Sequence, residues 1–111
     1  MKIETNEENG IVSFIFEGRL DAVSSEEAES TMMKAIESKG CYLYNLAALD
    51  YISSAGLRVL LSTTKQIKRS EGRFVMCAAN ANIRHVLDIS GFASIFPLVD
   101  TLEEGPRMLT E

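Results

Sequence analysis

The chain has 111 residues and a mass of 12.3 kDa, and 46% of its residues are hydrophobic while 24% are charged. This length and balance predict one folded domain over residues 1–111, and they exclude two separate cores and an extended disordered chain. The net charge of -5 argues against a nucleic-acid partner, because nucleic-acid binders usually present a basic face to the phosphates.

The N-terminal part of the chain predicts a β-hairpin followed by a helix. Strand-like segments at Lys2–Thr5 and Ile11–Glu17 flank an Asn-Gly pair, and both of those residues tolerate the positive φ of a tight hairpin turn. Ser24 and Glu27 form a capping-box pattern, so a helix is expected over about residues 25–38.

The rest of the chain predicts alternating strands and helices. The expected elements are a strand at Cys41–Ala47, a helix over about 55–70, a strand at Arg73–Ala79, a short helix capped by Asn80 or Asn82, an edge strand at Ile95–Val99, and a last helix opening at Asp100 and Glu103. Gly105 and Pro106 are expected to end that last helix early. The order ββαβαβαβα predicts an α/β domain with a mixed sheet of four or five strands and helices packed on it.

The sequence offers few groups for catalysis or metal binding. His85 is the only histidine, and its place on the short third helix predicts a surface or partly packed residue. Neither of the Gly-rich phosphate-binding patterns is present, and no serine, histidine and aspartate have the order or spacing of a catalytic triad. We therefore predict no catalytic residue, no bound metal and no cofactor, and hence a protein that is not an enzyme.

The sequence also predicts a cytoplasmic protein without a membrane partner. No apolar run approaches the roughly 18 residues that a membrane span requires, and the N-terminal MKIETNEENG lacks the apolar core of a signal peptide. Cys41 and Cys77 stand far apart and outside any CxxC pattern, so both are expected to be buried, reduced thiols rather than a disulfide or part of a zinc site.

The Ser53-Ser54-Ala55-Gly56 segment places two hydroxyl groups where a strand is expected to pass into a helix. Helix capping alone accounts for it, because serine is a preferred N-cap and glycine permits close packing. Alternatively, an exposed hydroxyl at a helix start can be phosphorylated, which adds about -1.5 to -2 charges that the free amides of the helix can hold. The residues alone leave both interpretations open.

A wider pattern favours the second interpretation. Residues 45–60, NLAALDYISSAGLRVL, resemble the signature of STAS domains, and more narrowly that of the bacterial anti-sigma factor antagonists. Further matches lie at Gly18-Arg19-Leu20-Asp21 and, towards the C-terminus, at Ile83, Val86, Leu87, Gly91, Phe92, Ile95, Phe96, Glu103 and Glu104. The resemblance covers nearly the whole chain, and it implies a single STAS-like domain that acts as a regulatory binding protein.

The resemblance implies a phosphorylation switch centred on Ser54, two residues before Gly56, with Ser53 as the alternative acceptor. A GHKL-type serine kinase that is itself an anti-sigma factor would phosphorylate the serine, and a PP2C-type phosphatase would reverse the modification. The unphosphorylated protein would bind the kinase and so release a sigma factor. Asp21 matches the loop aspartate of the family, and we expect the partner to bind around Asp21, Ser53, Ser54, Gly56 and Arg58.

A STAS module that works without phosphorylation, as part of a transport or signalling assembly, is the alternative function. The serine before Ala55-Gly56 favours the switch, since it supplies a phosphate acceptor. A partner can close over the neutral hydroxyl, whereas binding the phosphorylated form would require removing water from a phosphate dianion. Burying an unpaired charge costs several kcal/mol, and roughly 1.4 kcal/mol already changes affinity tenfold.

Overall fold

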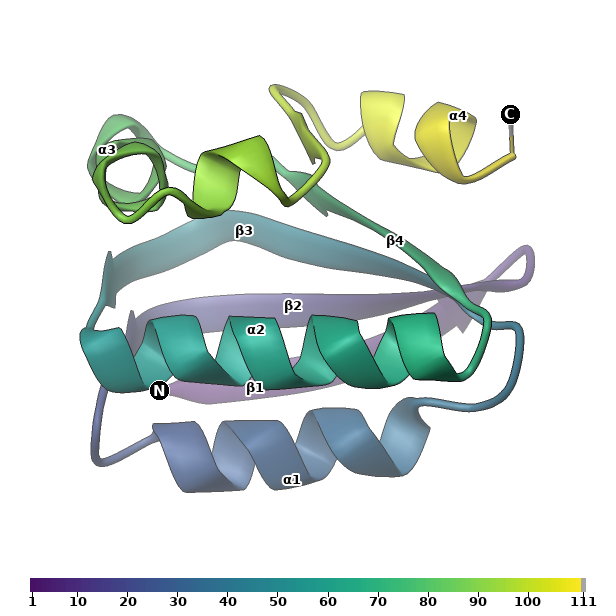
Figure 1. Cartoon of the computed structure of the whole chain (residues 1–111), viewed down its shortest axis with the longest axis horizontal. Coiled ribbons are helices and arrows are strands. Elements are labelled where there is room, and N and C mark those ends of the chain that lie inside the picture. The colour runs from purple at the N-terminus through teal and green to yellow at the C-terminus, as the bar shows by residue number, and fades with distance from the viewer. Residues whose placement is uncertain (111) are drawn as a thin grey trace.

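The computed structural model describes residues 1–110 and contains a five-stranded mixed sheet with helices on both faces (Figure 1). In chain order the elements are β1 (Lys2–Glu8), β2 (Ile11–Leu20), α1 (Ser25–Ala35), β3 (Cys41–Ile52), α2 (Ser54–Arg69), β4 (Arg73–Cys77), α3 (Ala81–Ile89), the 3-10 turn η1 (Phe92–Ser94), β5 (Leu98–Val99) and α4 (Glu104–Thr110). The strands lie in the order β1-β2-β3-β4-β5, with β1 antiparallel to β2 and the other neighbours parallel. The predicted α/β class and element order are confirmed.

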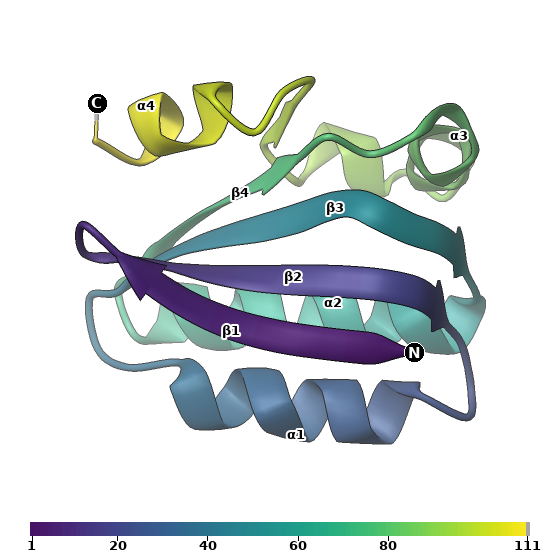
Figure 2. The same ribbon diagram turned by 180° about the vertical axis from the view of Figure 1, so that it is seen from behind.

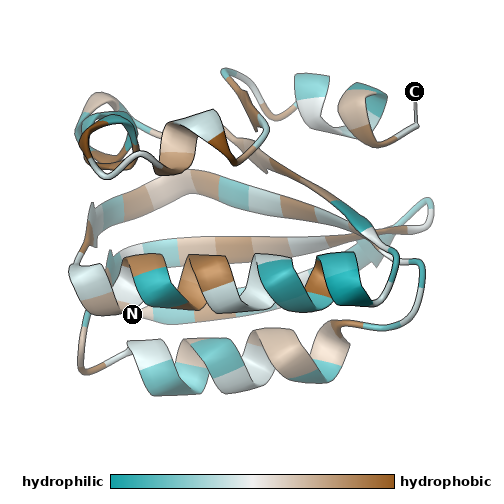
Figure 3. Ribbon diagram, in the orientation of Figure 1, coloured by the Kyte–Doolittle hydropathy of each residue, from teal (hydrophilic) through white to brown (hydrophobic). Residues whose placement is uncertain are grey.

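The main core lies between the sheet and helices α1 and α2. Alternate residues of β2 and β3 point to that side, where the rings of Phe14 and Tyr44 meet edge to face with centroids 5.3 Å apart. The Tyr44 hydroxyl shares a buried hydrogen bond of 2.8 Å with Thr63 of α2, and burial raises the pKa of this tyrosine. Hydrophilic and hydrophobic residues alternate along α2 in Figure 3, as expected for a helix with one buried face.

Helix α4 covers a smaller core on the opposite face of the sheet. That core consists of Leu43, Val75, Cys77 and Leu109, and burial raises the pKa of the Cys77 thiol to about 11. Seen from behind in Figure 2, β1 and β2 are not covered by a helix on this face. Both cysteines are free thiols, and the expectation that both are buried is wrong for Cys41, which is only half-buried.

The start of α4 differs from its predicted form. Gly105 and Pro106 lie in the first turn of α4 and do not end the helix. Proline is tolerated there because the amides of the first turn have no partner within the helix, so the missing N–H of proline costs no hydrogen bond. Gly105 is buried, and a Cβ atom on it would lie 2.6 Å from the sulfur of Cys77. Thr101 and Glu104, not Asp100 and Glu103, form the capping pair, through a 3.3 Å bond from the Glu104 amide to the Thr101 hydroxyl.

Several element boundaries also differ from the predicted ones. Helix α1 ends at Ala35, because Ile36 is extended and the Tyr42 hydroxyl hydrogen-bonds the amide and carbonyl of Glu37. Strand β3 runs on to Ile52, and β5 is reduced to two residues at the predicted edge position. The hairpin turn and the Asn80 cap are confirmed, the latter by a 2.9 Å bond from the Ile83 amide. No helix within residues 1–110 has the length and apolar character needed to cross a membrane.

The close contact of Gly105 with the sheet predicts that Gly105→Ala destabilises the protein. The added methyl would meet the Cys77 sulfur and the Leu43 side chain, each 2.6 Å from the Cβ position, so α4 must shift. We expect a loss of about 1–3 kcal/mol in the free energy of unfolding, measured by chemical denaturation. Arg107→Ala, an exposed change in the same helix, serves as the control, and equal stability of the two variants would refute the packing argument.

Candidate functional site

The predicted site residues gather where β2 and β3 end side by side. These strands are parallel, so both leave the sheet at the same edge, with Leu20 of β2 paired to Ile52 of β3. The amide of Ser53 donates a 3.0 Å hydrogen bond to the carbonyl of Leu20. The structure therefore brings the loop that begins at Asp21 next to the start of α2, although the two are more than 30 residues apart in sequence.

The two serines have different environments. Ser53 is the N-cap of α2, half-buried, and its hydroxyl accepts a 3.3 Å hydrogen bond from the amide of Gly56. Ser54 is the first residue of the helix and is exposed, and its hydroxyl has no hydrogen-bond partner within residues 1–110. The first turn of α2 holds no acidic residue. An added anion at Ser54 would therefore meet the positive end of the helix and no like charge in that turn.

Gly56 allows α2 to begin close to the strand ends. A Cβ atom at this position would lie 2.5 Å from the Leu20 carbonyl oxygen and 2.7 Å from the Ile52 side chain. The Leu20 carbonyl oxygen belongs to the backbone and cannot move aside as a flexible side chain can. Any residue larger than glycine would therefore push the first turn of α2 away from β2. Gly56 is buried, so it shapes this surface only by setting the positions of Ser53 and Ser54.

Asp21 organises its own loop. Its Oδ1 accepts hydrogen bonds of 3.1 Å from the Val23 amide and 3.2 Å from the Ser24 amide. The bond from the Ser24 amide is the largest cause that lowers the pKa of Asp21, and the bond from the Val23 amide and the nearby Arg19 guanidinium, 3.7 Å from Oδ2, lower it further.

The predicted capping box of Ser24 and Glu27 is wrong. Ser24 is the N-cap of α1 by position, but its side chain caps no helix amide. Its hydroxyl instead donates to the carbonyl of Arg19 at 2.8 Å and accepts from the amide of Asp21 at 3.1 Å. The Ser24 side chain therefore stabilises the loop before α1 and does not cap the helix, because the Arg19 carbonyl of β2 lies within hydrogen-bond distance.

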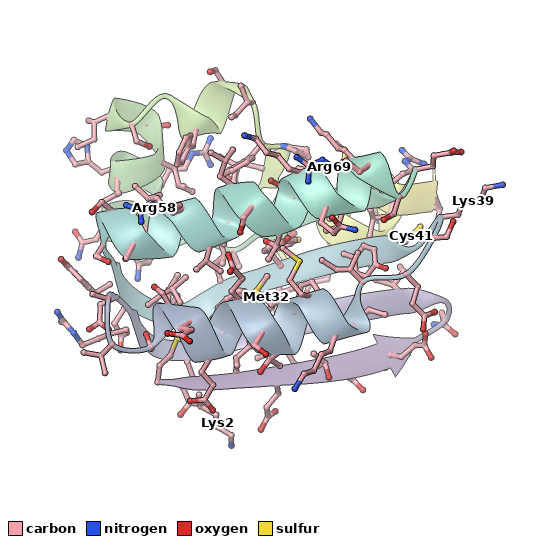
Figure 4. All side chains as sticks on the ribbon, turned by 60° about the horizontal axis from the view of Figure 1, so that its bottom comes forward. Lys2, Met32, Lys39, Cys41, Arg58 and Arg69 are labelled. Atoms are coloured by element: carbon pink, nitrogen blue, oxygen red, sulfur yellow. The ribbon has the colours of Figure 1, made fainter. Side chains whose placement is uncertain are left out.

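Arg58 lies one turn after Ser54 on α2 and is exposed. Figure 4 shows it near the start of α2, at the end of the molecule away from Lys39 and Cys41. It lines a shallow depression of about 180 Å³ between the two helices, whose other lining residues are Ser25, Glu26, Glu29, Ala55 and Val59. No acidic side chain within residues 1–110 forms an ion pair with Arg58, so its charge is available at this end of the molecule.

Two residues at this edge were missed by the sequence analysis. Val23 is 92% exposed, and Tyr51 is 42% exposed with the Arg19 guanidinium 4.1 Å from the centre of its ring. A single valine before a helix is not part of a hydrophobic periodicity, so the sequence does not predict its exposure. The structure of the loop shows that it faces solvent. His85 is exposed, as predicted, and no cluster of three or more His, Cys, Asp or Glu suited to a metal occurs in the described part of the chain.

Comparison with known proteins identifies relatives over almost the whole chain. Residues 2–105 match the family model of the STAS domain. BtrV of Bordetella bronchiseptica, a protein named as an anti-sigma factor antagonist, is 34% identical over 104 residues, which cover 93% of this chain and 90% of BtrV.

Two solved structures show the same fold. The anti-sigma factor antagonist from Mycobacterium paratuberculosis has a TM-score of 0.90 at 20% identity, over 99% of this chain and 94% of that protein. The phosphorylated form of the Bacillus cell-fate determinant SpoIIAA has a TM-score of 0.69 at 18% identity, over 93% and 95% of the two chains.

The hydrogen bonds of Asp21 predict that its loop depends on the carboxylate oxygen that accepts them. In Asp21→Asn one oxygen can still accept from the Val23 and Ser24 amides, whereas in Asp21→Ala both bonds are lost. We expect hydrogen exchange of these two amides to be at least tenfold faster in Asp21→Ala than in the wild type, with Asp21→Asn between the two because its acceptor oxygen is neutral. Asp50→Ala, at an exposed position of β3, is the control.

The same bonds give the loop a pH dependence. Because the pKa of Asp21 is lowered in the folded protein, the stabilisation is fully present above the ordinary aspartate pKa. It is lost as the pH falls through the lowered value. Amide protection in Asp21→Ala equal to that of the wild type at neutral pH would contradict this account.

Proposed function

The chain belongs to the STAS domain family, and we propose that it is an anti-sigma factor antagonist whose partner binding is switched by phosphorylation of Ser54. Anti-sigma factor antagonists are non-enzymatic regulatory proteins. In the proposed cycle the unphosphorylated protein, in the cytoplasm, binds a GHKL-type serine kinase that is also the anti-sigma factor, and a sigma factor is released. Phosphorylation of Ser54 by this kinase ends binding, and a PP2C-type phosphatase restores the binding form.

The observation that carries the proposal is the free, exposed hydroxyl of Ser54 at the first position of α2. A kinase must bring the acceptor oxygen in line with the terminal phosphate of ATP, which requires an accessible hydroxyl. Ser53 is less accessible, because it is half-buried and its hydroxyl oxygen already accepts the Gly56 amide. Ser54 is therefore the favoured acceptor, and Ser53 the alternative.

A phosphate on Ser54 can change binding without changing the fold. The N-terminal amides of α2 favour an anion there, so the modified protein keeps its stability. A partner that closes over this edge would have to desolvate about -1.5 to -2 added charges, which opposes binding. The existence of a phosphorylated form of SpoIIAA, which shares the fold, supports this interpretation.

Phosphoryl transfer provides the first test. Incubation with the cognate kinase and ATP is expected to add one phosphate to the wild type and to Ser53→Ala, and none to Ser54→Ala, as measured by intact mass and peptide mapping. Ser53→Ala is the matched control, since it removes the neighbouring hydroxyl and leaves Ser54 in place. Labelling of Ser54→Ala at the wild-type level would refute the assignment, and no transfer to any of the three proteins would favour a phosphorylation-independent STAS module.

The charge of the phosphate is tested by Ser54→Asp. We expect at least tenfold weaker binding to the kinase, about 1.4 kcal/mol, because a charge then lies at the contact surface. The thermal midpoint should hardly change, since an acidic residue is favourable at a helix start. Ser54→Asn is the control, because asparagine is close to aspartate in size and carries no charge. Calorimetry gives the affinity of each variant, and thermal denaturation gives its midpoint. Unchanged affinity of Ser54→Asp would contradict the electrostatic basis of the switch.

A further inference from the structure

Val23 is the most exposed of the large hydrophobic residues in the described part of the chain, at 92%. It lies in the short loop between β2 and α1. Keeping an apolar side chain in water forgoes the favourable free energy of its burial. Single exposed apolar residues are common on protein surfaces, so exposure alone does not indicate a binding site.

The loop that carries Val23 is ordered by hydrogen bonds on both sides of it. The Asp21 carboxylate accepts from the Val23 amide itself and from the amide of the next residue, Ser24. The Ser24 hydroxyl ties the far side of the loop to the carbonyl of Arg19 at the end of β2. Val23 is thus held in one position before any partner arrives, and binding through it requires little additional ordering of the chain.

The loop joins the Ser54 edge to an acidic surface on α1. On one side, Leu20 directly precedes the loop, and its carbonyl is bonded to the Ser53 amide. On the other side, the first turn of α1 carries Glu26 and Glu27, both exposed. No basic side chain within residues 1–110 forms an ion pair with either glutamate. Both glutamates and Val23 border one shallow surface depression.

We propose that Val23 is the apolar anchor of the partner interface, and that it inserts into an apolar pocket of the kinase whose rim carries basic side chains opposite Glu26 and Glu27. The inference rests on the proposed function and defines the part of the partner surface adjacent to the phosphorylated serine. An apolar centre with a charged rim is the usual arrangement of a protein interface, and the unpaired glutamates set the sign of the rim. Asp21 then also acts as a positioning residue, through the loop.

The test measures binding of the kinase that labels Ser54 to purified variants by calorimetry. Val23→Ser keeps the backbone amide that Asp21 binds, so the fold should be unchanged, while the affinity should fall at least tenfold. Met108→Ser is the matched control, because Met108 is an exposed apolar residue on α4, away from the start of α2, and its change should leave the affinity as it is. Thermal denaturation checks that both variants are folded.

The contribution of Glu26 and Glu27 is tested by the salt dependence of kinase binding. Wild-type affinity should fall with rising salt, and the double variant Glu26→Lys and Glu27→Lys should bind at least tenfold more weakly, with an affinity that rises with salt because like charges then face each other. Wild-type affinity in Val23→Ser would overturn the inference and leave the proposed function intact. If no kinase binds the wild type or labels Ser54, the proposed function fails, and this inference fails with it.

Discussion

The arrangement of the site depends on the parallel pairing of β2 with β3. This pairing ends in the hydrogen bond from the Ser53 amide to the Leu20 carbonyl, and it places two loops distant in sequence at one sheet edge. Gly56 makes the junction possible, because a side chain there would collide with that same carbonyl. The start of α2 is therefore fixed against the core, and the position of Ser54 follows from the packing of the sheet.

The neighbouring serines divide two tasks between them. Ser53 satisfies a helix amide and is held by it, while Ser54 presents an unbonded hydroxyl to solvent. In the proposed switch this difference favours Ser54 as the acceptor, because modification of Ser54 leaves the hydrogen bond between Ser53 and Gly56 in place.

The sequence predicts the fold well because its main signals are local and agree with one another. The strand-like segment at Ile11–Glu17, the Asn-Gly turn and the Asn80 cap each indicate one element, and together such signals predict the element order. The failures occur where tertiary contacts override local rules. Ser24 and Glu27 match the capping-box pattern, yet the Ser24 hydroxyl donates to the Arg19 carbonyl of β2. Gly105 has the form of a helix breaker, yet it serves the close contact of α4 with Cys77. The exposure of Val23 has no sequence signal, because it depends on how Asp21 folds its loop.

In the proposed switch, one phosphate on Ser54 separates a binding form from a non-binding form of the same fold. The most direct measurement isolates both forms of the protein from its native cells by ion exchange, maps the phosphate by mass spectrometry, and determines the kinase affinity and thermal midpoint of each. The account predicts one phosphate on Ser54, at least tenfold weaker binding of the modified form, and closely similar midpoints. A modified form that binds the kinase as tightly as the unmodified one would contradict it.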